Sequence, residues 1–150
     1  MTDLLAFEDF QPGQKYALGE RTLTEAEIIA FASEYDPQPQ HTDPEAAKHG
    51  MLGGLIASGW HLCAVAMRMI VDGLFGRAMS LGSPGVEEVQ WRRPVRPGEM
   101  LRLESEVLET SAPASKPDRG FVRIRFEMFR GDEKVMLFIA TAMIAKRING

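Results

Sequence analysis

The sequence predicts an α+β fold in which a curved antiparallel sheet wraps around one long apolar helix. Three observations support this prediction: residues 58–74 read as a helix with almost no polar face, several strand-like segments follow it, and no second long helix is predicted to cover the sheet. The chain has 150 residues, 45% of them hydrophobic, which is typical of one globular domain. We therefore assign residues 1–150 to a single domain.

Before the long helix, the chain predicts a short strand, a capped helix and a loop. A strand is expected around residues 16–18, after an irregular opening. Thr24 is a good N-cap, and Glu27 three residues later completes a capping box at a helix start. Four apolar residues of this helix recur at helical spacing and are expected to face the core: Ile28, Phe31, Ala32 and Tyr35. Two prolines then end the helix, so residues 36–41 are predicted to form a loop.

A second, short helix is predicted where Asp43 is the N-cap and Pro44 takes the first helical position. Glycines then mark a flexible connection to the long helix, which begins near Ser58 and ends near Leu74. Its polar residues fall on one narrow stripe: His61, Arg68 and Asp72. Because the remainder of this helix is apolar, we expect it to be buried on most sides.

The rest of the chain predicts an antiparallel meander of four strands. The expected strands are residues 86–93, 100–109, 121–130 and 134–145. Two of them alternate apolar and charged residues, and the last is apolar on both faces, so it is expected inside the sheet. Gly131-Asp132 is a typical hairpin turn. The open edges of such a sheet favour edge-to-edge pairing of two subunits, which predicts a homodimer or an assembly of dimers.

Composition excludes several classes of function. The formal net charge of −4 argues against a general nucleic-acid or anionic-membrane binder. No apolar stretch is long enough to span a bilayer, and the first residues lack the layout of a signal peptide, so we expect a cytoplasmic protein. The single cysteine, Cys63, lies in the apolar helix and reads as a small core residue rather than a nucleophile.

The first candidate for chemistry is the pair Asp36 and His41, at the two ends of a six-residue segment that contains two prolines. A carboxylate and an imidazole held close together can share one water molecule and move its protons. By spacing alone, the pair is equally readable as a solvated aspartate at a helix end and a histidine of a surface loop.

The second candidate is the segment 53–60, in which glycines let the backbone approach a ligand and a helix begins. Free N–H groups at a helix start attract an anion or a polarised carbonyl oxygen. The alternative is a plain loop in which Ser58 is an ordinary N-cap. The basic cluster of Arg92, Arg93 and Arg96 either contacts phosphates or is simply solvated.

No metal or other cofactor is expected. Four residues with suitable donor atoms lie within twenty-one positions: His41, Asp43, His49 and His61. Their spacing fits no compact ligand pattern, and Asp43 is already explained as a helix cap.

Several segments resemble, in order, the MaoC-like dehydratases, the group of R-specific enoyl-CoA hydratases. The segment from Asp36 to His41, Asp-Pro-Gln-Pro-Gln-His, is similar to that family's Asp-x-Asn-Pro-x-His motif, with Gln38 in place of the asparagine. The Gly-Leu-Ile-Ala-Ser-Gly-Trp segment ending at Trp60 is similar to the second family element, with Ser58 where a histidine is common. The opening Phe-Glu-Asp-Phe, the Thr-Leu-Thr-Glu helix start and the segments at 82–86 and 93–98 also match.

This resemblance implies the hotdog fold, a homodimer and an acyl thioester substrate carried on coenzyme A. It implies that Asp36 and His41 are the catalytic acid/base pair and that the backbone N–H of Gly59 binds the thioester oxygen. We assign Gly54, Ser58 and Gln38 to substrate binding on the same grounds. Coenzyme A is then part of the substrate, and no separate cofactor is implied.

The sequence therefore predicts a hydratase/dehydratase that reversibly adds water to a 2-enoyl-CoA to give a 3-hydroxyacyl-CoA. Two alternatives stay open. A hotdog thioesterase normally activates water with a carboxylate near the helix, whereas this helix has no carboxylate before Asp72. A non-catalytic protein that binds acyl-CoA or another small ligand would share the fold but would not need Asp36 and His41.

Overall fold

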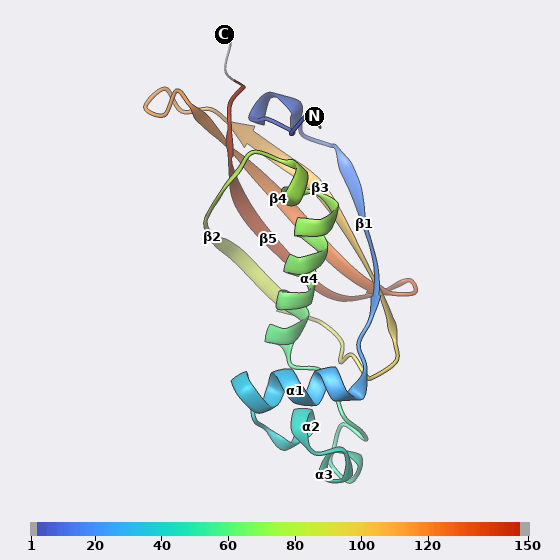
Figure 1. Cartoon of the computed structure of the whole chain (residues 1–150). Coiled ribbons are helices and arrows are strands. Elements are labelled where there is room, and N and C mark those ends of the chain that lie inside the picture. Colours follow the sequence, from blue (N-terminus) through green and yellow to red (C-terminus); the bar gives the residue numbers. More distant parts are fainter. Residues whose placement is uncertain (1–2, 148–150) are drawn as a thin grey trace.

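The computed structural model describes residues 3–147, which form a five-stranded antiparallel sheet and a long helix that lies along one of its faces (Figure 1). The strand order is β1-β3-β4-β5-β2. The strands are β1 (Lys15–Thr22), β2 (Ser80–Trp91), β3 (Met100–Ser111), β4 (Arg119–Arg130) and β5 (Glu133–Ala145). The helices are α1 (Glu25–Tyr35), α2 (Pro39–Thr42), α3 (Pro44–Lys48) and α4 (Gly59–Gly73), with short 3₁₀ turns at Phe7–Asp9 and Phe75–Arg77.

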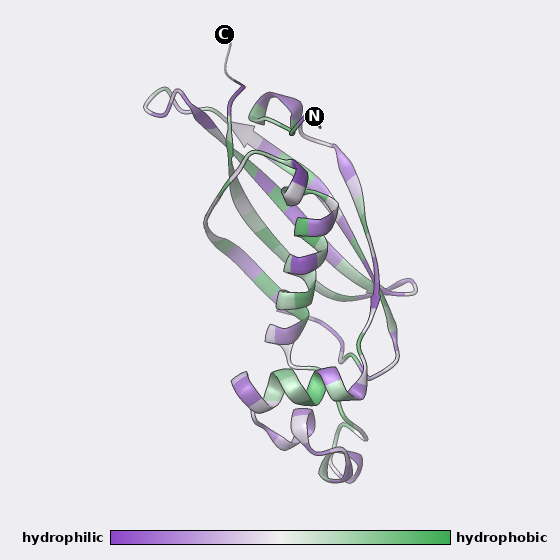
Figure 2. Cartoon of the chain, in the orientation of Figure 1, coloured by the Kyte–Doolittle hydropathy of each residue, from purple (hydrophilic) through white to green (hydrophobic). Residues whose placement is uncertain are grey.

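The core lies between α4 and the sheet. Hydrophobic and hydrophilic residues alternate along the strands behind α4 (Figure 2), and the inward-facing residues of β3 and β4 are fully or almost fully buried, as their alternation predicts. On β4 these residues are Val122, Ile124, Phe126 and Met128. They pack with the buried side of α4, which includes Leu62, Val65, Ala66, Met69 and Ile70. The predicted curved antiparallel sheet on one long helix is thus confirmed.

The local helix signals are confirmed. Thr24 and Glu27 form the predicted capping box, with the Glu27 N–H donating to Thr24 Oγ1 at 3.1 Å. Asp43 caps α3 by accepting from the N–H of Ala46 at 3.1 Å. Arg68 and Asp72 form an exposed ion pair on α4, one turn apart. No helix of residues 3–147 has both the length and the hydropathy needed to cross a membrane.

Three expectations about the helices are wrong. Residues 36–41 are not all loop, because Pro39 takes the first position of the one-turn helix α2, where its missing N–H costs nothing. Tyr35 does not face the core but is 67% exposed at the last turn of α1. His61 is not on a polar surface but is buried, because its ring stacks on Phe31 of α1 at a centroid distance of 4.5 Å.

The helix α4 is also less enclosed than its composition predicts. The sheet covers one side of it and α1 touches its first turns, whereas the opposite side stays open in this chain. Trp60, Met67 and Val71 form an exposed apolar stripe along that side.

The strand order corrects the predicted meander. Only β3, β4 and β5 pair in sequence order, whereas β2 pairs with β5, the last strand of the chain. As a result β5 is internal, as its apolar faces predict, and the two edges are β1 and β2. The connection over residues 92–99 carries the chain from the β2 edge toward the other side of the sheet.

Candidate active site

A cavity of about 380 Å³ opens at the N-terminal end of α4, where α2, the segment before α4 and the end of β2 meet. Asp36, His41 and Gly59 all line it, so the fold brings together the three predicted catalytic positions. The rest of the wall is mostly apolar and includes Ile56, Leu62, Trp60 and Trp91. Arg92 and Arg93 also line it, from the end of β2.

The imidazole of His41 is held in one orientation. The short helix α2 carries the side chain inward, where it is 7% exposed, and its Nδ1 lies 2.8 Å from the carbonyl oxygen of Ile56. Because a carbonyl oxygen can only accept, Nδ1 carries the proton of this hydrogen bond. In the neutral ring the lone pair is then on Nε2, which lies 3.4 Å from Oδ2 of Asp36.

The Asp36 carboxylate is held by two neutral donors. Asp36 is the C-cap residue of α1, directly after its last residue. Its Oδ1 accepts a hydrogen bond from the side-chain amide of Gln38 at 2.6 Å. Its Oδ2 accepts from the hydroxyl of Ser58 at 2.7 Å. These hydrogen bonds lower the pKa of the Asp36 carboxyl below its ordinary value, with a smaller contribution from the nearby His41, while desolvation opposes them. Asp36 is therefore ionised at neutral pH.

Gly59 begins α4 and leaves a free backbone donor at the cavity. The N–H groups of His61 and Leu62 both bond to the carbonyl of Ser58, and the Gly59 N–H forms no hydrogen bond with any of residues 3–147. A Cβ at Gly59 would lie only 2.5 Å from Cε2 of Trp91, so glycine is required for the indole to pack here.

The three positions predicted to bind substrate do not line the cavity. Gln38 and Ser58 instead contact the Asp36 carboxylate, and Ser58, although it occupies the N-cap position, gives α4 no side-chain cap. Gly54 lies against the guanidinium of Arg96, which would be 2.9 Å from a Cβ at that position. A direct contact of these residues with substrate stays a prediction.

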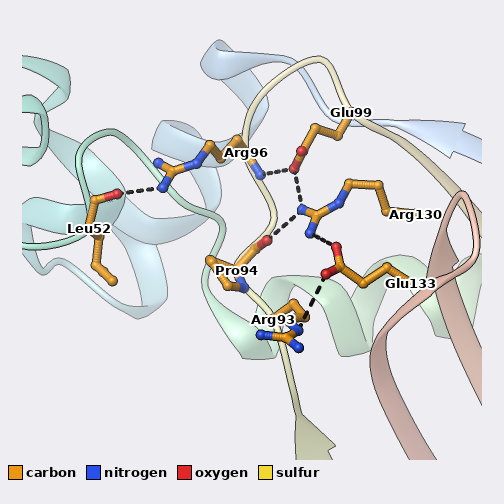
Figure 3. A network of polar contacts seen from close by, with 7 residues as sticks. All are labelled: Leu52, Arg93, Pro94, Arg96, Glu99, Arg130 and Glu133. Atoms are coloured by element: carbon orange, nitrogen blue, oxygen red, sulfur yellow. Dashed lines mark hydrogen bonds and ion pairs between the residues drawn. The ribbon is translucent and has the colours of Figure 1, made fainter.

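The arginines of the segment after β2 have different surroundings. Figure 3 shows Arg96 donating to the carbonyl of Leu52, and Arg93 paired with Glu133 at 3.4 Å. The guanidinium of Arg92 donates to the side-chain amide oxygen of Gln90 at 3.0 Å and has no carboxylate partner among residues 3–147. Arg92 is thus the unneutralised cation at the cavity.

A second set of contacts in Figure 3 fixes the loop that forms the cavity wall. Arg130 of β4 donates to the carbonyl of Pro94 at 2.8 Å and to Glu99 at 2.9 Å, and it also pairs with Glu133. Pro94 and Val95 follow in the wall of the cavity. The ends of β4 and β5 therefore hold the wall opposite α4.

The histidines and acids considered as metal ligands are dispersed. His49 is exposed and pairs with Glu45, His61 stacks on Phe31, and Asp43 caps α3. In the part of the chain that the structure describes, no three His, Cys, Asp or Glu side chains gather as a metal site would require.

Sequence reasoning missed the role of Trp91 in the cavity. Its indole packs on Gly59, and its ring meets that of Trp60 edge to face, at a centroid distance of 5.1 Å. Trp91 lies within the strand predicted over residues 86–93, but nothing local to residue 91 indicates that its side chain meets the start of α4.

Comparison with known proteins shows the family of this chain. The family model of the MaoC like domain matches residues 9–119. The structure of the MaoC-like dehydratase from Rhodospirillum rubrum is 37% identical, with a TM-score of 0.89 over 97% of this chain and 99% of that one. YdeM of Bacillus subtilis is 30% identical over 106 residues, which are 70% of this chain and 74% of that protein.

A further solved structure extends the likeness of fold. The R-hydratase PhaJ1 from Pseudomonas aeruginosa is 24% identical, with a TM-score of 0.79 over 97% of this chain and 89% of that one. The chain thus belongs to the MaoC-like domain family and has the hotdog fold of its dehydratases.

Proposed function

We propose that this protein is a hydratase/dehydratase of acyl-CoA thioesters, which reversibly adds water to a 2-enoyl-CoA to give a 3-hydroxyacyl-CoA. The observation that carries the proposal is the convergence of three groups at one cavity: the Asp36 carboxylate, the Nε2 of His41 and the free N–H of Gly59. A proton acceptor, a fixed anion and an oxyanion donor are the groups that addition of water to an enoyl thioester requires.

In the proposed reaction, one water molecule contacts both His41 Nε2 and Asp36 Oδ2, which are 3.4 Å apart. His41 takes a proton from this water as its oxygen bonds to the β carbon. The electron pair of the double bond moves toward the thioester, and the oxygen becomes an enolate stabilised by the Gly59 N–H. The proton on Nε2 then passes to the α carbon, which restores the thioester and regenerates neutral His41.

Asp36 has a supporting role in this scheme. Hydrogen bonds from Ser58 and Gln38 keep the Asp36 carboxylate ionised. The carboxylate accepts a hydrogen bond from the second O–H of the water, which orients the water, and its charge stabilises the transient imidazolium of His41. Dehydration of the 3-hydroxyacyl thioester follows the same steps in reverse, because each proton has a defined donor and acceptor.

Two features of the cavity support coenzyme A as the carrier of the acyl thioester. Its wall is mostly apolar, which suits an acyl chain, while Arg92 offers a charge with no carboxylate partner in residues 3–147. A guanidinium in such a place is suited to the phosphates of coenzyme A.

We also propose that the protein is a homodimer. β2 is a long edge strand, and most of its residues are exposed, including Leu81 and Val86. The apolar stripe of α4 is exposed as well. A second copy of the chain that pairs along β2 would satisfy the edge hydrogen bonds and cover apolar surface in one step.

The test of the activity is a matched set of isosteric variants. Asp36→Asn and His41→Gln should each lower the rate of enoyl-CoA hydration by ~100–10,000-fold, because each removes one proton-handling group. The double variant should be little worse than either single one, since both groups act on one water. Asp72→Asn and His49→Gln make the same chemical changes on exposed residues and are expected to retain full activity.

Two assays separate the alternatives. Loss of the enoyl-thioester absorbance reports hydration, whereas a free-thiol assay reports release of coenzyme A by a thioesterase. Wild-type hydration in Asp36→Asn would remove the proposed function. Binding of acyl-CoA without either reaction, over short, long and branched chains, would favour the non-catalytic alternative.

A further inference from the structure

Trp91, the last residue of β2, lies across the beginning of α4. Three atoms of its indole, Cε2, Cδ2 and Nε1, would be 2.5–2.8 Å from a Cβ at Gly59, so the ring lies directly against the glycine backbone. Trp60 meets the ring at 74°, with its centroid 5.1 Å away. The indole is therefore held between the helix backbone and a second aromatic ring.

One turn beyond Gly59, ~6 Å further along α4, the same face of the helix carries the thiol of Cys63. Burial raises the pKa of that thiol, and a hydrogen bond with Trp91 opposes the rise. Cys63 Sγ is in turn 3.8 Å from Sδ of Met136 on β5, the residue paired with Trp91 in the sheet. Trp91, Cys63 and Met136 thus fill the space between α4 and the β2–β5 edge.

This packing has a consequence for a bound thioester. Its oxygen must reach the Gly59 N–H while its β carbon lies at Asp36 and His41, so the acyl chain beyond the β carbon occupies the apolar cavity beside Gly59. The indole of Trp91 is one of the two indoles in that wall, the other being that of Trp60. An acyl chain that continues along α4 past Gly59 would meet the ring of Trp91.

Resting on the function proposed above, we propose that Trp91 is the specificity-determining wall that restricts this enzyme to short-chain 2-enoyl thioesters. Replacing the indole with a small side chain opens the space toward Cys63 and Met136 and lets a longer chain run along α4. Trp91 does not touch the reacting atoms in this scheme, so its removal changes which substrates are accepted rather than the chemistry.

The test compares crotonyl-CoA with trans-2-decenoyl-CoA as substrates of the wild type, Trp91→Phe and Trp91→Ala. In the wild type, kcat/KM should be at least ~10-fold higher for crotonyl-CoA, since an apolar pocket discriminates even one poorly accommodated methylene by roughly that factor. Trp91→Ala should raise kcat/KM for the decenoyl substrate by ~10-fold or more, with Trp91→Phe intermediate. Leu81→Ala, at the other end of β2, should keep the wild-type ratio.

A second measurement makes the wall testable without turnover. In the wild type, calorimetry should show tighter binding of butyryl-CoA than of decanoyl-CoA, neither of which can be hydrated. Trp91→Ala should raise the affinity for decanoyl-CoA by the same factor as it raises kcat/KM for the decenoyl substrate. Melting curves establish that each variant is folded.

The outcomes are distinguishable. If no hydration is measured, but the affinities for butyryl-CoA and decanoyl-CoA behave as expected in the wild type and in Trp91→Ala, the proposed function is overturned. Trp91 is then the wall of a binding site. Equal use of crotonyl-CoA and decenoyl-CoA by the wild type, or an unchanged affinity ratio in Trp91→Ala, would overturn the role of Trp91 and leave the hydratase in place.

Discussion

The contact between Gly59 and Trp91 gives a quantitative prediction for Gly59→Ala. The new Cβ would be 2.5 Å from Cε2 of Trp91, whereas ordinary contacts are 3.4–4 Å, so the indole must retreat by about 1 Å. Trp60 and Cys63 stand beside the ring and resist that movement. Overpacking of this kind typically costs ~1–3 kcal/mol, which is the expected loss in the free energy of unfolding.

The same displacement should affect turnover. The N–H of residue 59 is retained in Gly59→Ala, but relief of the overlap with Trp91 is expected to tilt the start of α4, and with it this N–H, away from the thioester oxygen. Loss of a well-placed oxyanion donor costs ~100–1000-fold in rate, and we expect hydration to fall by that order. Gly59→Val should lower both the free energy of unfolding and the rate of hydration by more than Gly59→Ala does.

A double-mutant cycle with Trp91→Ala isolates the contact. Urea unfolding of the wild type, both single variants and the double variant should give a coupling of ~1 kcal/mol or more, because the alanine at 59 has no ring to overlap once Trp91 is removed. Gly59→Ala should also cost less activity toward crotonyl-CoA in the Trp91→Ala background. If Gly59→Ala lowers stability equally in both backgrounds, the packing argument is refuted.

Three further predictions concern Asp36, His61 and the edge strand. Ser58→Ala removes a hydrogen bond that lowers the pKa of Asp36, so an NMR titration of the Asp36 carboxyl carbon should give a higher pKa than in the wild type, and an unchanged titration would contradict the positioning role of Ser58. Burial lowers the pKa of His61 below the ordinary 6.5, so the unfolded chain binds the proton more tightly. The urea midpoint should therefore fall as the pH drops below 6.5, and His61→Phe should weaken this dependence. Light scattering should give twice the chain mass of 16.7 kDa, whereas Val86→Lys on the β2 edge should shift the protein toward the monomer. A wild-type monomer at micromolar concentration would contradict the dimer.

The local signals in the sequence were reliable where a few neighbouring residues decide the structure. The capping box of Thr24 and Glu27 and the cap of Asp43 depend on groups three positions apart, and both are present. The alternation of β3 and β4 depends on a single buried face, and it predicted the core residues of these strands. The pair Asp36 and His41 was singled out by spacing and resemblance, and a short helix after Pro39 brings it together.

The remaining features depend on contacts between distant parts of the chain. Ser58 was expected to touch substrate, but folding brings its hydroxyl to Asp36, 22 residues earlier. His61 shares a helical stripe with Arg68, yet it is buried because Phe31 of another helix covers it. The pairing of β2 with β5 rather than β3 depends on where the connection over residues 92–99 leads.

The type of each main element and the buried face of the strands were therefore predictable from the sequence, because they arise from hydropathy and hydrogen bonding over a few consecutive residues. The contacts of Ser58 and Gln38 with Asp36, and of Trp91 with Gly59 at the wall of the cavity, were not predictable. The physical reason is that such contacts join atoms far apart along the chain, and their distance is set by the packing of α4 on the sheet.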